Sequence, residues 1–122
     1  MGDLSPHFSN HEFVCRDGTS TEIDPQLIEM LEQLRAALGG HPIRITSGYR
    51  SPSYNAQVGG AKNSYHLRGM AADIQVPGAH PTEVHAMAER LFPSYGGIGL
   101  YQRGAGGWVH IDSRRPRARW TG

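Results

Sequence analysis

Two apolar segments of this chain each contain one side chain that is costly to bury. The segment AADIQV (71–76) holds Asp73 between alanine and isoleucine, and the segment GWVHIDS (107–113) holds His110 between valine and isoleucine. Both segments have the composition of buried strands. An unpaired carboxylate in such a strand costs several kcal/mol, so the burial of Asp73 calls for a cation. The chain is therefore restricted to folds that can place a cation beside these strands.

The other predicted elements are helices and strands in an irregular order. A helix is predicted over residues 25–38, because Asp24 can cap it, Pro25 suits its first position and apolar residues follow at helical spacing. Shorter helices are predicted within residues 51–58 and over residues 81–91. Four strands are also predicted, over residues 42–47, 70–76, 97–101 and 107–113.

The order of these elements indicates an α+β fold. The last two strands are joined by the glycine-rich stretch QRGAGG, which is typical of a hairpin. Helices and antiparallel strands are mixed without a regular β-α-β alternation, which predicts a small antiparallel sheet with flanking helices. With 122 residues, the chain is expected to form a single domain, 1–122, with a core of its own. The single Cys15 excludes an internal disulfide and is expected to be a small buried residue.

Composition narrows the range of partners. A formal net charge of +1 gives no bulk attraction to polyanions, and no nucleic-acid motif is present. The arginine-rich stretch SRRPRARW (113–120) is expected to be a solvated tail, with a patch for an anionic polymer as the alternative. No apolar run approaches the roughly 20 residues that span a membrane. The N-terminal segment lacks the pattern of a signal peptide, and we expect a monomer.

A third potential ligand precedes the first of the two buried strands. His66 is predicted in a loop just before it, where Gly69 permits close approach of the backbone. Two histidines and one aspartate make a three-ligand zinc site, which leaves the fourth position for water as in catalytic sites. No HExxH helix is present. The remaining histidines have no suitably spaced partner and are expected at the surface: His7, His11, His41, His80 and His85.

Three motifs in register identify a family. SGYRSPSYN (47–55), SYHLRGMAADI (64–74) and GWVHIDS (107–113) resemble the zinc-dependent D-alanyl-D-alanine peptidases, which share a superfamily with lysostaphin-type enzymes and the hedgehog signalling domain. The likeness is greatest to the small murein endopeptidase branch, whose members also carry segments like LSPHFSNHEFVCRDG (4–18) and GGIGLY (96–101). The resemblance covers nearly the whole chain and implies the fold of this superfamily.

The resemblance also implies roles for individual residues. It implies that His66, Asp73 and His110 bind one Zn²⁺ ion and that Arg50 points into the cleft. The guanidinium of Arg50 could hold a substrate carboxylate or a developing oxyanion, and a surface ion pair is the alternative. Ser64 belongs to the family signature and is expected to shape the loop or bond to a neighbour.

One departure from the family pattern concerns the general base. Dipeptidase and carboxypeptidase relatives place a glutamate three residues before the last histidine ligand, and here that position is Gly107. Asp112 should project on the same side of its strand as His110. It could serve as the base, or it could orient the imidazole of His110. Tyr49 and Tyr101 are expected to line the substrate cleft, although such aromatic residues often belong to the core.

The resemblance implies a zinc metallopeptidase that hydrolyses amide bonds in the peptide stems or cross-links of bacterial peptidoglycan. Such an enzyme would act at the cell wall, either in the periplasm or after delivery by a phage. Two alternatives remain open. One is a non-catalytic zinc-containing binding module, which the glycine at position 107 favours. The other is an amidohydrolase of the same fold that acts on a non-murein peptide.

Overall fold

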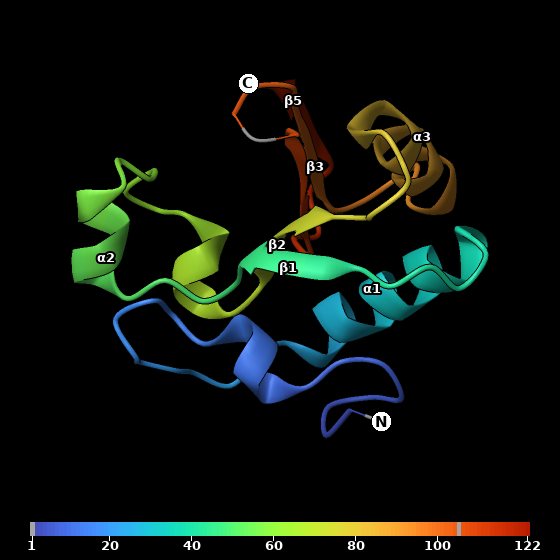
Figure 1. Cartoon of the computed structure of the whole chain (residues 1–122). Helices are drawn as coiled ribbons and strands as arrows, with labels where there is room; N and C mark the ends of the chain where they lie inside the picture. Colours follow the sequence, from blue (N-terminus) through green and yellow to red (C-terminus); the bar gives the residue numbers. More distant parts are fainter. Residues whose placement is uncertain (1, 105) are drawn as a thin grey trace.

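The computed structural model describes residues 2–104 and 106–122 and confirms the α+β class (Figure 1). Three α-helices, two short 3₁₀ helices and five strands follow one another in an irregular order. The helices are η1 (Asn10–Phe13), α1 (Pro25–Ala37), α2 (Pro52–Gln57), η2 (Tyr65–Arg68) and α3 (Pro81–Leu91). The strands are β1 (Arg44–Ser47), β2 (Ala71–Gln75), β3 (Gly97–Tyr101), β4 (Trp108–Asp112) and β5 (Ala118–Thr121).

The strands form one mostly antiparallel sheet in the order β1-β2-β4-β3-β5. The β1–β2, β2–β4 and β4–β3 pairs are antiparallel, and β5 runs parallel to β3. The hairpin predicted between the strands at 97–101 and 107–113 is confirmed by the β3–β4 pairing. Ala105, between these two strands in the sequence, lies outside the described residues.

Local sequence signals account for the two longer helices. The Asp24 carboxylate accepts a hydrogen bond from the Gln26 N–H at 3.2 Å and so caps α1, which begins with Pro25 as predicted. Helix α1 ends at Ala37, one residue before the predicted end, and Leu38 is its half-buried C-cap. Helix α3 has the predicted bounds, and the His80 side chain caps it.

One sheet face makes the hydrophobic core. In an antiparallel pair, residues directly opposite each other share a face, and successive residues alternate between faces. The pairs Ala72–Ile111 and Ile74–Val109 therefore face the same way, and all four side chains are buried. In Figure 1, α1 and α3 lie together at one side of the sheet, and α2 lies at the opposite side of the molecule. The core is completed by apolar residues of α1 and α3: Leu27, Ile28, Met30, Leu31, Leu34, Val84 and Ala88.

The arginine-rich C-terminal stretch is not a solvated tail, and this prediction is wrong. Its last part forms β5, which lies at the edge of the sheet beside β3 (Figure 1). The side chain of Arg119 is only 13% exposed. Its guanidinium donates hydrogen bonds to the Glu89 carboxylate and to the carbonyl oxygens of Phe92 and Gly96. These acceptors satisfy the charge and allow a basic residue to enter a strand.

The predictions for the remaining residues are mostly confirmed. Cys15 is buried, and His7, His11, His41 and His80 are exposed, whereas His85 is half-buried. Within residues 2–104 and 106–122, no helix is long and apolar enough to cross a membrane.

Candidate metal centre

The structure brings His66, Asp73 and His110 together on the sheet face opposite the core. Asp73 of β2 lies directly across from His110 of β4, so their side chains share a face. His66 comes from η2, whose first backbone N–H groups are capped by Ser64: the Ser64 hydroxyl accepts a hydrogen bond from the His66 N–H at 3.2 Å. Gly69 ends η2 with a left-handed φ of 67°, which permits the sharp turn into β2.

The three side chains converge on one carboxylate oxygen. Asp73 Oδ1 lies 3.4 Å from His66 Nε2 and 3.2 Å from His110 Nδ1. One ligand atom from each residue lies within 4.8 Å of the other two, and all three residues are buried. A tetrahedral zinc ion with bonds of about 2.0–2.1 Å separates its ligand atoms by about 3.4 Å. The observed spacing therefore fits a zinc ion.

In each imidazole, the nitrogen that points away from Asp73 makes a hydrogen bond that fixes the tautomer. The nitrogen that faces Asp73 therefore carries no proton in the neutral ring. His66 Nδ1 lies 2.7 Å from the carbonyl oxygen of Gly48, which can only accept, so Nδ1 carries the proton. His110 Nε2 lies 2.8 Å from a carboxylate oxygen of Asp112 and is likewise the donor. In the neutral rings, His66 Nε2 and His110 Nδ1 then direct their lone pairs at the Asp73 carboxylate. Two lone pairs that face an anion repel it, and a cation between them removes the repulsion.

The electrostatics of the site keep its carboxylates ionised. Burial would raise the pKa of Asp73, but in the metal-free site the His110 and His66 imidazoles, when protonated, donate to this carboxylate and hold its pKa well below its usual range. Burial would lower the pKa of His110, but hydrogen bonds to Asp112 and Asp73 outweigh it and raise this pKa. A bound divalent cation would replace the proton that His110 otherwise attracts.

Arg50 contacts the second oxygen of Asp73. Its Nη2 lies 3.2 Å from Asp73 Oδ2, and the side chain is 16% exposed. Two further N–H groups of Arg50 donate to Ser47 Oγ at 3.2 Å and to Asn55 Oδ1 at 3.3 Å. A guanidinium has five N–H donors, so two remain beyond these three bonds. Arg50 is therefore a half-buried partner of Asp73 with capacity to bind a further acceptor.

A cavity of about 750 Å³ opens beside the three ligand side chains. Its lining includes residues 58–66 and three aromatic side chains near the C-terminus: Tyr101, Trp108 and Trp120. Arg50 and Arg114 also line this cavity. A peptide bound here would lie directly against the ligand group.

Comparison with known proteins agrees with this geometry. The Peptidase M15 family matches residues 6–112. This chain belongs to the Peptidase M15 family.

Three similar proteins have names that describe peptidases. A protein of Haemophilus influenzae, "Probable peptidoglycan L,D-endopeptidase MepK", is 32% identical over 91% of this chain and 62% of its own length. The "Peptidoglycan L,D-endopeptidase MepK" of Escherichia coli K12 is 36% identical over 80% of this chain and 54% of its own length. The "Zinc D-Ala-D-Ala carboxypeptidase" of Streptomyces albus G is 37% identical over 63% of this chain and 32% of its own length. The chain thus spans between about a third and two thirds of these relatives.

Asp112 of this M15 chain is enclosed by donors and does not line the cavity. The residue is 0% exposed. Its carboxylate accepts hydrogen bonds from His110 Nε2, from the Gly97 N–H at 2.9 Å and from the Arg114 guanidinium at 2.7 Å. Burial would raise the pKa of Asp112, but these bonds from His110 and Arg114 hold it well below the usual range. The contacts favour the orienting role over that of a base, which must reach the reacting water.

Two glycines of β3 make room for the site on this sheet face. Gly97 lies opposite Asp112, and a Cβ atom there would come within 2.2 Å of the Asp112 carboxylate. Gly99 lies opposite His110 and beside Trp120 of β5, and a Cβ atom there would come within 2.4 Å of the Trp120 indole. The space beside Gly99 is filled by the Trp120 ring, whose centroid lies 4.9 Å from that of the His110 ring. Trp120 and Arg114 were not predicted as site residues, and the alternating glycines were the available signal.

Gly107, where the family resemblance leads us to expect a glutamate, has a backbone conformation that disfavours any side chain. Its φ is 69°, and a Cβ atom there would lie 2.5 Å from the carbonyl oxygen of Tyr101. The turn that leads into β4 therefore requires glycine.

The predicted substrate-binding residues lie in different places. Tyr101 and Ser64 line the cavity. Tyr49 packs against the hydrophobic core and is not among the residues that line it. The position of Tyr49 thus supports the alternative, in which it is a core residue.

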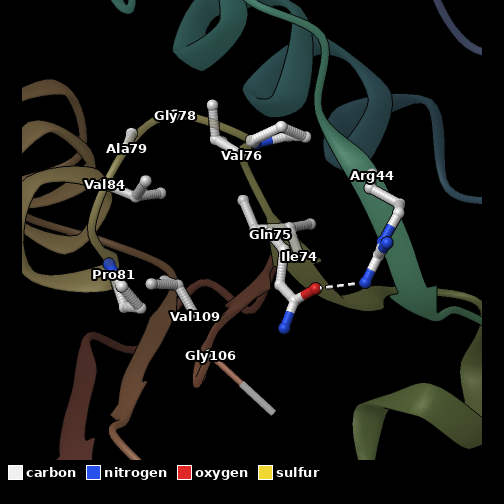
Figure 2. A pocket seen from close by; sticks show the side chains of 11 residues that line it. Arg44, Ile74, Gln75, Val76, Gly78, Ala79, Pro81, Val84, Gly106 and Val109 are labelled. Carbon is white, nitrogen blue, oxygen red and sulfur yellow. Dashed lines mark hydrogen bonds between the residues drawn. The ribbon is translucent and has the colours of Figure 1, made fainter.

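A second cavity, of about 290 Å³, lies on the core side of the sheet (Figure 2). Its lining includes Ile74, Val84 and Val109, and Figure 2 shows the Arg44 side chain reaching toward Gln75, to which it donates a hydrogen bond. None of the described residues that line it is a histidine, cysteine or acid. Among the described residues, the one group of three side chains that could hold a metal ion lies at the first cavity.

Proposed function

We propose that this chain is a zinc peptidase that hydrolyses amide bonds in the peptide stems or cross-links of bacterial peptidoglycan. The observation that carries the proposal is the pair of imidazoles whose unprotonated nitrogens face one Asp73 oxygen beside a peptide-sized cavity. Membership of the M15 family and the names of the relatives support the reaction and the substrate. Such an enzyme acts at the cell wall.

The ligands in this proposal are His66, Asp73 and His110, which would hold one ion. A bound zinc ion supplies a Lewis acid and lowers the pKa of a water molecule to near neutrality. The Gly48 carbonyl and the Asp112 carboxylate keep the two imidazoles in the tautomers that ligate. Each ligand is thus oriented by a hydrogen bond that is present before the ion arrives.

Arg50 and Asp112 have separate tasks in this proposal. The two remaining N–H donors of Arg50 would hold a substrate carboxylate or the oxyanion that develops as the amide carbonyl is attacked. Arg50 also holds Asp73 Oδ2, which fixes the orientation of that ligand. Asp112 would act through His110 as a positioning residue, because its carboxylate is enclosed by His110, Gly97 and Arg114.

Digestion of purified sacculi tests the proposal. Zinc-loaded protein should release soluble muropeptides whose masses show a cleaved stem or cross-link, and a chelator should abolish the release. His66→Ala should bind no zinc and release nothing, because one of three ligands is lost. Intact sacculi, together with a full complement of zinc in the wild-type protein, would refute the proposed activity.

A non-catalytic zinc-containing module is the second candidate. The observation that favours it is Gly107, because no carboxylate stands at the position where the family resemblance leads us to expect the general base. This candidate predicts that zinc-loaded protein sediments with sacculi but leaves their muropeptide profile unchanged. Release of cleaved stems would exclude it.

A further inference from the structure

The cavity beside the candidate metal centre carries more positive than negative side chains. Arg50, Lys62, Arg103 and Arg114 line it, and Asp73 is the one acidic residue among its described lining. Two of these cations are already paired, since Arg50 contacts Asp73 and Arg114 contacts Asp112. The other two, Lys62 and Arg103, have no acidic partner among the described residues. The cavity therefore holds uncompensated positive charge, which favours an anionic ligand.

Arg103 is held in place by an aromatic stack. The rings of Tyr101 and Trp108 are stacked with centroids 4.6 Å apart and planes 7° from parallel. The Arg103 guanidinium carbon lies 5.8 Å from the centroid of each ring, at the distance of a cation–π contact. The Trp120 indole N–H donates to the Tyr101 hydroxyl at 2.8 Å and fixes the stack further. Arg103, an exposed residue, thus lies against the side of the aromatic stack, and its N–H groups have no hydrogen-bond partner among the described residues.

The aromatic side chains connect Arg103 to the candidate metal centre. Trp120 packs against the ring of His110, and Tyr101 links Trp120 to Trp108. These rings form one continuous wall of the cavity, with the ligand His110 at one end and Arg103 at the other. A peptide that lies along this wall with its hydrolysed bond at His110 reaches Arg103 with a group outside that bond.

We propose that Arg103 is a specificity-determining residue that binds a free carboxylate of the substrate outside the hydrolysed bond. The substrate class is then the peptide stem whose carboxylates are free, in preference to the same stem in carboxamide form. This inference rests on the proposed function. The planar guanidinium can bind a carboxylate through two parallel N–H···O bonds, which a carboxamide cannot match. Lys62 lacks both the fork of donors and the aromatic support.

Kinetics on matched peptides test the inference. Stem peptides are prepared with all carboxylates free and with each carboxylate outside the hydrolysed bond converted in turn to a carboxamide. For the zinc-loaded wild type, one conversion should lower kcat/KM by about tenfold, mainly through a higher KM. Arg103→Gln should show a loss of similar size on the free peptide and no further loss on that carboxamide. Arg103→Lys should keep part of the preference, and the preference should shrink at high salt.

Arg68→Gln is the matched control. Arg68 also lies over a tyrosine ring, 5.2 Å from the centroid of Tyr65, but it does not line the cavity. This variant should keep the wild-type preference for the free carboxylate. Equal wild-type rates on all peptides, or an undiminished preference in Arg103→Gln, would overturn the inference while leaving the proposed function intact. Failure of the wild type to hydrolyse any stem peptide would overturn both.

Discussion

Asp112→Asn is the substitution that most sharply tests how the candidate metal centre is organised. The side chain keeps its size, but one of its two oxygens becomes an NH₂ group. In one orientation this NH₂ faces His110 Nε2 and the Arg114 guanidinium, and in the other it faces the Gly97 N–H. Either way, a donor meets a donor.

The relief of this conflict determines the expected result. If the NH₂ group faces His110, the imidazole can accept its hydrogen bond only by moving its own proton to Nδ1. That nitrogen faces Asp73, so the change removes the lone pair that would ligate the ion. We expect zinc affinity to fall by about 10–100-fold, as for other outer partners of ligating histidines. The free energy of unfolding should fall by roughly 1–3 kcal/mol, because a buried donor loses its acceptor.

Zinc affinity is measured by competition with a chromophoric chelator, and stability by denaturant unfolding of the metal-free protein. Asp24→Asn is the control, since Asp24 caps α1 and asparagine is an equally good cap. It should change neither quantity appreciably. Wild-type zinc affinity in a folded Asp112→Asn protein would refute the claim that Asp112 sets the tautomer of His110.

Three further outcomes are expected. Arg50→Ala should keep zinc and lower kcat by roughly 10²–10³-fold, as measured by steady-state hydrolysis of a stem peptide, if its free donors hold the oxyanion. Gly97→Ala and Gly99→Ala should each lower the melting temperature and the zinc affinity, because the added methyl group collides with a site side chain. The control is Ile98→Val, on the opposite sheet face, which should lower the free energy of unfolding by only about 1 kcal/mol. The pKa of His110 is higher in the folded protein than the unfolded value of 6.5, so protonation of His110 stabilises the metal-free fold. This contribution is fully present below pH 6.5 and is lost as pH rises through the folded pKa. Zinc must displace the same proton, so the increase in melting temperature on adding zinc should grow between pH 6 and pH 8 in calorimetric scans, and an increase independent of pH would contradict the role of His110.

The sequence predicted those parts of the fold that local signals determine. The bounds of α3 and the start of α1 follow from a cap, a proline and an apolar face, all within one segment. Strand β5 was not predicted, because it pairs in parallel with a strand distant in sequence and contains Arg119, whose acceptors are carbonyl groups after α3. Such acceptors depend on the tertiary fold and leave no pattern in the strand itself.

In the site too, only the residues that stand out in their own segment could be predicted. Asp73 and His110 were conspicuous because their types contradict the apolar strands around them, and the structure places them side by side. The contribution of Trp120 depends on the C-terminal segment returning to the sheet as β5, which the composition of that segment did not indicate. The donors around Asp112 come from His110 and Arg114, two residues away on either side, and from Gly97 of the neighbouring strand β3, so the argument for an orienting role required the structure.

A crystal structure of the zinc-loaded protein, with anomalous data collected on both sides of the zinc absorption edge, tests the central claim most directly. We predict one anomalous peak per chain, bonded to His66 Nε2, a carboxylate oxygen of Asp73 and His110 Nδ1, with the Asp112 carboxylate still on His110 Nε2. A peak elsewhere, or ligation through the opposite nitrogen of either histidine, would contradict the account.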